Sequence, residues 1–92
     1  MMVDYDGGGM ELVIDFYTKP NCLLCDDALV TLQLLQKMYS FQINICNIHE
    51  RDDWLEKYFL HIPVVAFDDM IITGEEIGFE RLEKEINRKI KE

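Results

Sequence analysis

Two cysteines, Cys22 and Cys25, are separated by two residues, and this pair is the strongest chemical feature of the sequence. It lies where a predicted strand is followed by a predicted helix, so the sulfurs are about one helical turn apart and can form a disulfide when they face each other. The first cysteine of such a pair sits at the helix N-terminus, where free N–H groups favour a thiolate. We predict that Cys22 is the nucleophile and that Cys25 resolves the mixed disulfide.

A second interpretation of the pair is a metal site, because two thiolates at this spacing can also bind zinc. A structural zinc site takes four ligands, and the further candidates are Cys46, His49 and His61. Their spacing matches no compact zinc pattern. Redox chemistry is the preferred interpretation because the pair follows a strand and opens a strand–helix–strand unit.

Composition excludes some classes of partner. The 92 residues suit one domain, and nine Lys and Arg against eighteen Asp and Glu give a net charge of −9, which repels phosphate backbones and anionic lipid. We therefore expect no nucleic-acid or membrane partner. The three cysteines do not suit a secreted disulfide scaffold, and no signal peptide or transmembrane run is apparent, so we expect a cytoplasmic protein. We also expect a monomer.

Hydrophobic periodicity predicts the elements that position the pair. Residues 1–10 include three consecutive glycines and are predicted to be a flexible leader, with residues 11–92 as the domain. Period-two alternation predicts strands over 11–17 and 41–46, and a hairpin of 64–67 and 70–72 with its turn at Asp68-Asp69. The helical period predicts a helix from just beyond Cys22 to about Tyr39 and another from about Phe79. Between them, a short helix through Trp54 to Phe59 is predicted, capped by Asp52 or Asp53.

The order of these elements predicts the fold class. Strand–helix–strand followed by strand–strand–helix is an α/β layout, in which two parallel strands need a helical crossover and the hairpin adds antiparallel strands. We therefore expect a four-stranded mixed sheet covered by helices. Within the first long helix, apolar residues recur at the helical period and form one stripe, made of Leu24, Ala28, Leu32, Leu35 and Met38 or Tyr39.

Residues 16–25, Phe-Tyr-Thr-Lys-Pro-Asn-Cys-Leu-Leu-Cys, resemble the active-site segment of glutaredoxins, and the elements over 11–92 resemble their thioredoxin-like fold. The run Cys22-Leu23-Leu24-Cys25-Asp26, followed by Ala28, is most similar to small glutaredoxin-like proteins that lack the usual Pro-Tyr between the cysteines. The resemblance implies a small thiol–disulfide oxidoreductase that uses this redox pair and holds no bound cofactor.

The resemblance also implies how a thiol substrate is held. The family's cis-proline maps onto Ile62-Pro63, where the backbone would pair with a bound thiol peptide. Lys19 matches the lysine that meets a glutathione carboxylate, and Gly74 and Glu75 stand where the family has a Gly-Gly and aspartate segment. The expected partners are a disulfide-containing protein or a glutathione mixed disulfide, with glutathione as a co-substrate. Neighbouring acids disfavour tight binding of glutathione, which is itself anionic.

A different class of function stays open: a binding module of the same fold that uses the cysteines for a metal or iron–sulfur centre, or acts as a protein adaptor. Two further residues have competing interpretations. Asp15 is predicted to face solvent in preference to moving protons to Cys25, as a buried acid does in thioredoxins. Cys46 is predicted to be a small buried or half-buried residue without a redox role.

Overall fold

A computed structural model of the chain describes residues 12–68 and 70–91. The predicted leader, residues 1–10, and the turn residue Asp69 lie outside these ranges. The elements run in this order: β1 (Leu12–Thr18), α1 (Leu23–Gln36), β2 (Phe41–Asn47), η2 (Ile48–Glu50), α2 (Asp52–Tyr58), β3 (Val64–Phe67), β4 (Met70–Thr73), η3 (Gly74–Glu76) and α3 (Phe79–Lys91). Each strand and long helix predicted from the sequence is present.

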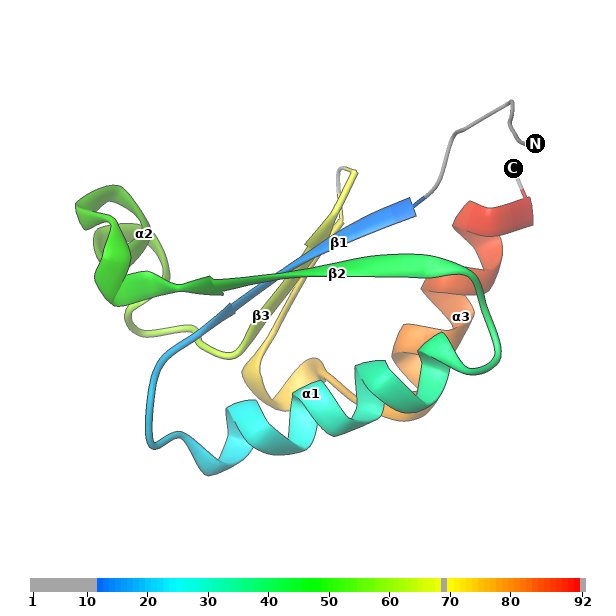
Figure 1. Ribbon diagram of the computed structural model, residues 1–92, viewed down its shortest axis with the longest axis horizontal. Helices are drawn as coiled ribbons and strands as arrows, with labels where there is room; N and C mark the ends of the chain where they lie inside the picture. Colours follow the sequence, from blue (N-terminus) through cyan, green and yellow to red (C-terminus); the bar gives the residue numbers. More distant parts are fainter. Residues whose placement is uncertain (1–11, 69, 92) are drawn as a thin grey trace.

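The strands form one sheet in the order β2-β1-β3-β4. β1 and β2 are parallel, with Leu12 opposite Phe41, whereas β3 runs antiparallel to both β1 and β4. The predicted α/β fold with a four-stranded mixed sheet is therefore confirmed. α1 and α3 lie on the same side of this sheet, and α2 lies on the other side at the end where α1 begins (Figure 1).

The alternation of side chains along β1 separates two cores. Ile14 and Phe16 are buried on the face covered by α1 and α3. This larger core consists of Ile14, Phe16, Cys25, Ala28, Leu32, Leu35, Phe41, Val65, Phe67, Ile72, Leu82 and Ile86. On the other face, Tyr17 packs against a small core of Ile48, Tyr58 and Val64 beneath α2. The end of β1 that leads to the cysteines is therefore held from both sides.

Two predictions about helices were wrong in detail. The predicted stripe included Leu24, but Leu24 is 60% exposed and Cys25 is the residue of this turn that is buried with Ala28 and Leu32, because Leu24 lies at the edge of the stripe, on the side that lines a surface groove. α1 ends at Gln36 and not near Tyr39, whose hydroxyl instead donates a hydrogen bond to Glu83 of α3 at 3.2 Å.

The short helix also begins and ends differently from the prediction. Its N-cap is Arg51, without a side-chain capping bond, and Asp52 is already the first helical residue. The carboxylate of Asp53 accepts two hydrogen bonds from the Arg51 guanidinium, at 2.9 and 3.0 Å, so it is engaged with that cation and does not cap the helix. α2 ends at Tyr58, with Phe59 as its C-cap.

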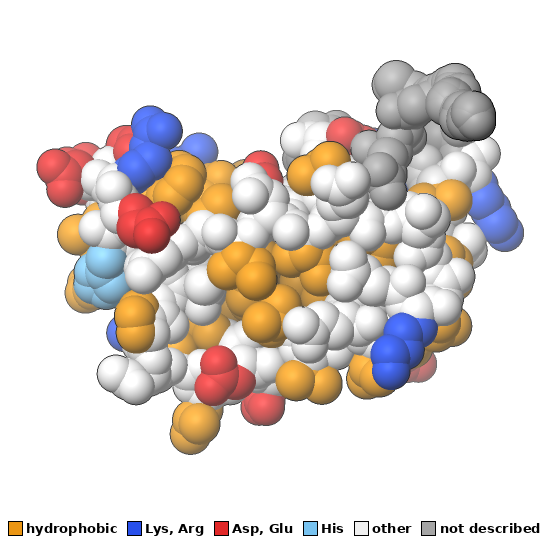
Figure 2. Space-filling view, in the orientation of Figure 1, with side chains coloured by type: hydrophobic (Ala, Val, Ile, Leu, Met, Phe, Trp, Pro, Cys, Tyr) orange, Lys and Arg blue, Asp and Glu red, His pale blue; other side chains and the backbone are white. Residues whose placement is uncertain are grey.

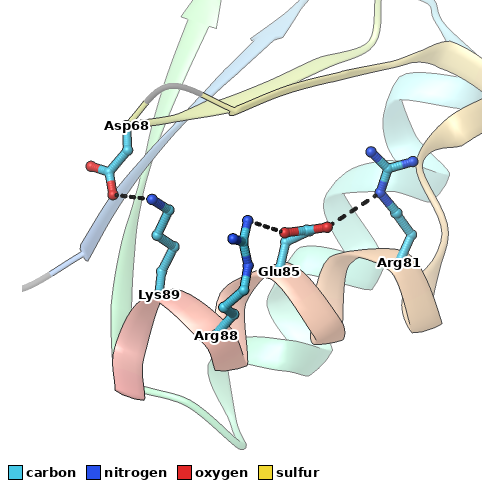
Figure 3. Close-up of polar contacts among 5 residues, drawn as sticks. All are labelled: Asp68, Arg81, Glu85, Arg88 and Lys89. Atoms are coloured by element: carbon cyan, nitrogen blue, oxygen red, sulfur yellow. Dashed lines mark hydrogen bonds and ion pairs between the residues drawn. The ribbon is translucent and has the colours of Figure 1, made fainter. Parts of the chain in front are cut away.

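Polar contacts tie α3 to the hairpin (Figure 3). The Glu85 carboxylate accepts a 2.7 Å hydrogen bond from Arg88 and lies 3.8 Å from the Arg81 guanidinium. One turn further on, the Lys89 ammonium lies 3.4 Å from the carboxylate of Asp68, in the turn after β3. The two contacts of Glu85 are within α3, and the Lys89–Asp68 ion pair joins this last helix to the turn after β3. In the described ranges, no helix is long and apolar enough to cross a bilayer.

Two isoleucines one turn apart on α3 test this packing. Ile86 is fully buried, whereas Ile90 is 41% exposed. We predict that Ile86→Ala lowers the free energy of unfolding by about 2–5 kcal/mol, through lost burial and a cavity. Ile90→Ala serves as the matched control and should cost less than about 1 kcal/mol. Urea denaturation followed by circular dichroism measures both, and equal losses would contradict the placement of the core.

Candidate active site

Cys22 and Cys25 are brought together at the start of α1. The chain leaves β1 through Lys19 and Pro20, and Asn21 adopts a positive φ of 60°, which turns the backbone into the helix. The two cysteines form a disulfide with their Cα atoms 5.1 Å apart. Cys22 is partly exposed, whereas Cys25 is only 1% exposed. Cys22 is therefore the sulfur that a substrate can approach, which suits the predicted roles of the two thiols.

The sulfur of Cys22 also caps the helix. Cys22 has an extended backbone (φ −121°, ψ 107°), and its Sγ accepts a hydrogen bond from the backbone N–H of Cys25 at 3.2 Å. Its carbonyl accepts the N–H of Asp26 at 3.0 Å, the first hydrogen bond of the helix. A helix N–H directed at a sulfur stabilises negative charge on it. This geometry favours a thiolate on Cys22 once the disulfide is reduced.

Asp15 cannot act directly on the buried thiol. Cys25 packs in the core with Ile14 and Phe16, so Asp15, which alternates with them, lies on the opposite face of the sheet. There it is half-buried, and its carboxylate accepts a 3.0 Å hydrogen bond from the side-chain amide of Asn44 on β2. Asp15 was predicted to face solvent; it lies on the face away from Cys25, but it is half-buried and hydrogen-bonded to Asn44.

The segment predicted to hold a thiol substrate lies at the end of the sheet where β1 leads to the cysteines, because Val64 pairs with Tyr17. The Ile62–Pro63 peptide bond is cis, as the resemblance implied. Ile62 packs against the same core as Cys22, and the Pro63 carbonyl accepts a 2.8 Å hydrogen bond from the N–H of Gly74. Lys19 lies in the loop before Cys22 and is partly buried. Four of the predicted site residues therefore lie at the end of the sheet where α1 begins: Lys19, Ile62, Pro63 and Gly74.

A groove of about 250 Å³ separates α1 from η3 and begins beside the cysteines. It is lined by Leu24, Asp27, Ala28, Thr31, Gly74, Glu75 and Ile77. Gly74 and Glu75 were predicted as site residues, whereas the four residues from α1 and Ile77 were not. The α1 residues have the spacing i, i+3, i+4, i+7, which places them on one helix face, and this signal was present in the sequence. Lys19 is not part of the lining.

The backbone conformation at residue 74, in the wall of the groove, explains why this residue is glycine. Gly74 has a positive φ of 46°, a conformation that residues with a Cβ rarely adopt, and its N–H is held by Pro63. The turn at Gly74 bends the chain from β4 into η3, which forms one wall of the groove. Acidic and hydrophobic side chains lie side by side on the surface where α1 begins (Figure 2).

An aromatic cluster supports the other side of the site. The Tyr17 ring stacks on Tyr58 with centroids 4.1 Å apart and meets the edge of Trp54 at 5.6 Å. Burial raises the pKa of Tyr17, and its hydrogen bond with Tyr58 adds to the increase. Because Tyr17 is the penultimate residue of β1, this cluster anchors the strand end from which the loop to Cys22 departs.

The third cysteine is remote from the pair. Cys46 is opposite Tyr17 on β2, 4% exposed, and its sulfur lies 3.5 Å from the Asn44 carbonyl. The prediction that Cys46 is buried or half-buried is confirmed. The burial of residues along β2 does not follow a strict two-residue alternation. Ile45 is 56% exposed because β2 is an edge strand. Within residues 12–68 and 70–91, no three His, Cys, Asp or Glu side chains form a metal-binding group.

Comparison with known proteins gives two kinds of match. A family model described as glutaredoxin-like domain (DUF836) matches residues 13–87. A solved structure described as a malarial protein is similar with a TM-score of 0.64 and 12% identity, covering 85% of this chain and 96% of the other. Oxidised mitochondrial thioredoxin 3 from Saccharomyces cerevisiae is similar with a TM-score of 0.61 and 19% identity, and the match covers 85% of this chain and 78% of the other. The structural matches show that the fold is thioredoxin-like.

The exposure of the thiols predicts their order of reaction. In the reduced protein at pH 7, we predict that iodoacetamide labels Cys22 at least about tenfold faster than Cys25 or Cys46, because Cys22 is accessible and capped by an N–H. Tandem mass spectrometry locates each label. In urea, the three cysteines should react at similar rates, which is the control. Faster labelling of Cys25 in the folded protein would reverse the roles assigned to the pair.

The buried third thiol predicts a dependence of stability on alkaline pH. Burial raises the pKa of Cys46, and the charges of Asp15 and Glu50 add to the increase. The folded protein then keeps a proton that the unfolded chain loses near pH 8.5. The contribution of this thiol to the free energy of unfolding is complete below about pH 8.5 and is lost as pH rises toward the raised pKa, by at most about 1.4 kcal/mol per pH unit.

Cys46→Ala should remove that component of the alkaline slope. Urea denaturation of both proteins between pH 7 and pH 9.5 measures it, with the Cys22–Cys25 disulfide kept oxidised so that neither sulfur titrates. The alanine variant will be less stable at every pH, so the comparison is of slopes and not of absolute values. Identical slopes would show that the Cys46 proton is not retained on folding.

Proposed function

The chain belongs to the glutaredoxin-like domain family, and on this basis we propose that it is a small thiol–disulfide oxidoreductase that reduces disulfides through Cys22 and Cys25. One observation carries the proposal. The sulfur of Cys22 is partly exposed at the first turn of α1 and receives the N–H of Cys25, while the second sulfur is buried beneath it. This arrangement supports an accessible attacking thiolate and an enclosed resolving thiol.

The proposed reaction has two steps. The Cys22 thiolate attacks one sulfur of the substrate disulfide, the substrate S–S bond breaks, and the departing thiolate takes up a proton. The Cys25 thiol then loses its proton and attacks the Cys22 sulfur, which forms the Cys22–Cys25 disulfide and releases the second substrate sulfur as a thiol. In total, the substrate gains two electrons and two protons, and the protein dithiol loses them.

The Cys22–Cys25 disulfide must be reduced by two electrons before the next cycle. Two glutathione molecules, oxidised to their disulfide, or a separate reductase would supply them in a reducing compartment. We propose no bound cofactor, and we propose a disulfide-containing protein or a glutathione mixed disulfide as the substrate. The reaction can run on a single subunit because one chain contributes both sulfurs.

Reduction of insulin disulfides by dithiothreitol, followed by turbidity, tests the proposal. The wild-type protein should accelerate the reaction, and Cys22→Ser should return it to the uncatalysed rate because the attacking sulfur is lost. Cys25→Ser should stall at a mixed disulfide between Cys22 and the substrate, which mass spectrometry detects. Cys46→Ala is the matched control and should retain at least about half of the activity, since Cys46 lies on the opposite face of the sheet from the core that holds Cys25.

Two outcomes would contradict the proposal. One is full reductase activity in Cys22→Ser. The other is a protein that purifies with stoichiometric zinc or iron on Cys22 and Cys25 and loses stability to a chelator, which would support the binding-module alternative. Consumption of NADPH, coupled through glutathione and its reductase or through a thioredoxin-type reductase, then distinguishes the two electron donors.

A further inference from the structure

We propose that the groove between α1 and η3 binds a cationic side chain of the substrate, so that the preferred substrate is a polypeptide disulfide with Lys or Arg close to its reactive cysteine. This inference rests on the proposed function, because it concerns the substrate of the same two sulfurs. It is carried by the position of the groove, by its apolar floor and by the sign of the charges at its rim.

The groove begins in the segment between the two cysteines. Leu24, one of its lining residues, lies between the two redox cysteines, and Thr31 lines the far end two helical turns away. Seven residues of helix span about 10 Å. A peptide joined through its cysteine to Cys22 advances about 3.5 Å per residue, so residues one or two positions from that cysteine lie within reach of the groove.

The lining suits a long side chain that is apolar along its stem and charged at its end. Leu24, Ala28 and Ile77 form the apolar part of the lining. Lys and Arg bury their methylene stems against such surfaces and keep the charged group at the polar rim. Exposed Leu23 and Leu60, 82% and 83% exposed, add apolar surface in the CxxC segment and in the loop before the cis-proline.

The charged residues of the groove are both acidic. Asp27 from α1 and Glu75 from η3 face a common hollow, and no Lys or Arg is among its lining residues. In the described ranges the ion pairs engage other acids, such as Asp53 and Glu85, and not these two. A cationic side chain therefore has two carboxylates available to it, whereas glutathione would bring further negative charge to the same place.

Two short peptides provide the test, each used as its homodimeric disulfide and differing only in Arg or Glu two residues after the cysteine. The reduced protein is mixed with each in a single turnover, and each second-order rate constant is divided by that of dithiothreitol, which corrects for intrinsic reactivity. We expect the wild-type protein to favour the Arg peptide by about fivefold to tenfold. This preference should shrink as salt is raised from about 20 mM to 500 mM, because screening weakens exposed charge pairs.

Variants assign the preference to the groove. Asp27→Asn with Glu75→Gln should reduce the Arg-to-Glu ratio to less than about twofold. The matched control is Asp52→Asn with Glu56→Gln, which removes two exposed acids from α2, at the same end of the sheet but outside the groove. It should keep most of the wild-type ratio.

The outcomes separate the two proposals. Equal reduction of both peptides, or an equal loss of preference in the α2 control, would overturn the cationic subsite and leave the oxidoreductase intact. Failure to reduce either peptide would reject the proposed function itself. Oxidised glutathione, as a third substrate, should react more slowly than the Arg peptide, and a faster reaction would also overturn this inference.

Discussion

The hydrogen bond from the Cys25 N–H to the Cys22 sulfur is the contact on which the candidate site depends. It requires α1 to begin at Leu23, with Cys22 as its N-cap, and the position of that first turn is set by burial and not by the cap alone. Cys25 opens the stripe that packs α1 on the sheet, so it belongs to the core and to the cysteine pair at once. A shift of α1 along the sheet would therefore move both sulfurs together.

The sheet brings the other parts of the site to this turn. β1 delivers the loop to Cys22, β3 begins directly after the cis-proline, and β4 ends where Gly74 turns into the groove wall. The Gly74 N–H bonded to the Pro63 carbonyl extends the β3–β4 pairing by one step to the groove. These segments are attached to neighbouring strands of one sheet. The sheet therefore fixes the positions of the disulfide, the proline and the groove relative to one another, without contacts from a separate domain.

The sequence predicts the fold well because each element has its own pattern, and it predicts the site only where a motif marks it. The cysteine pair and the hairpin follow from local spacing and turn residues. Leu24 was misplaced because hydrophobicity alone does not show which apolar residues a neighbouring element covers, and Cys25 is buried in the core where Leu24 was expected. The groove depends on how η3 lies across α1, a relation between residues about fifty positions apart in the chain that periodicity does not report.

The uneven distribution of charge links the fold to the proposed specificity. Residues 81–92 hold five of the nine basic residues and only three of the eighteen acids. On α3 these bases neutralise their neighbours: two arginines flank Glu85, and Lys89 reaches Asp68 at the turn after β3. The basic residues of α3 are therefore engaged within that helix and at the turn after β3, and among the described residues no ion pair reaches Asp27 at the start of α1 or Glu75 on η3. An anionic rim near the cysteine pair follows from this distribution of charge, and it is the basis of the proposed preference for cationic over anionic thiol substrates.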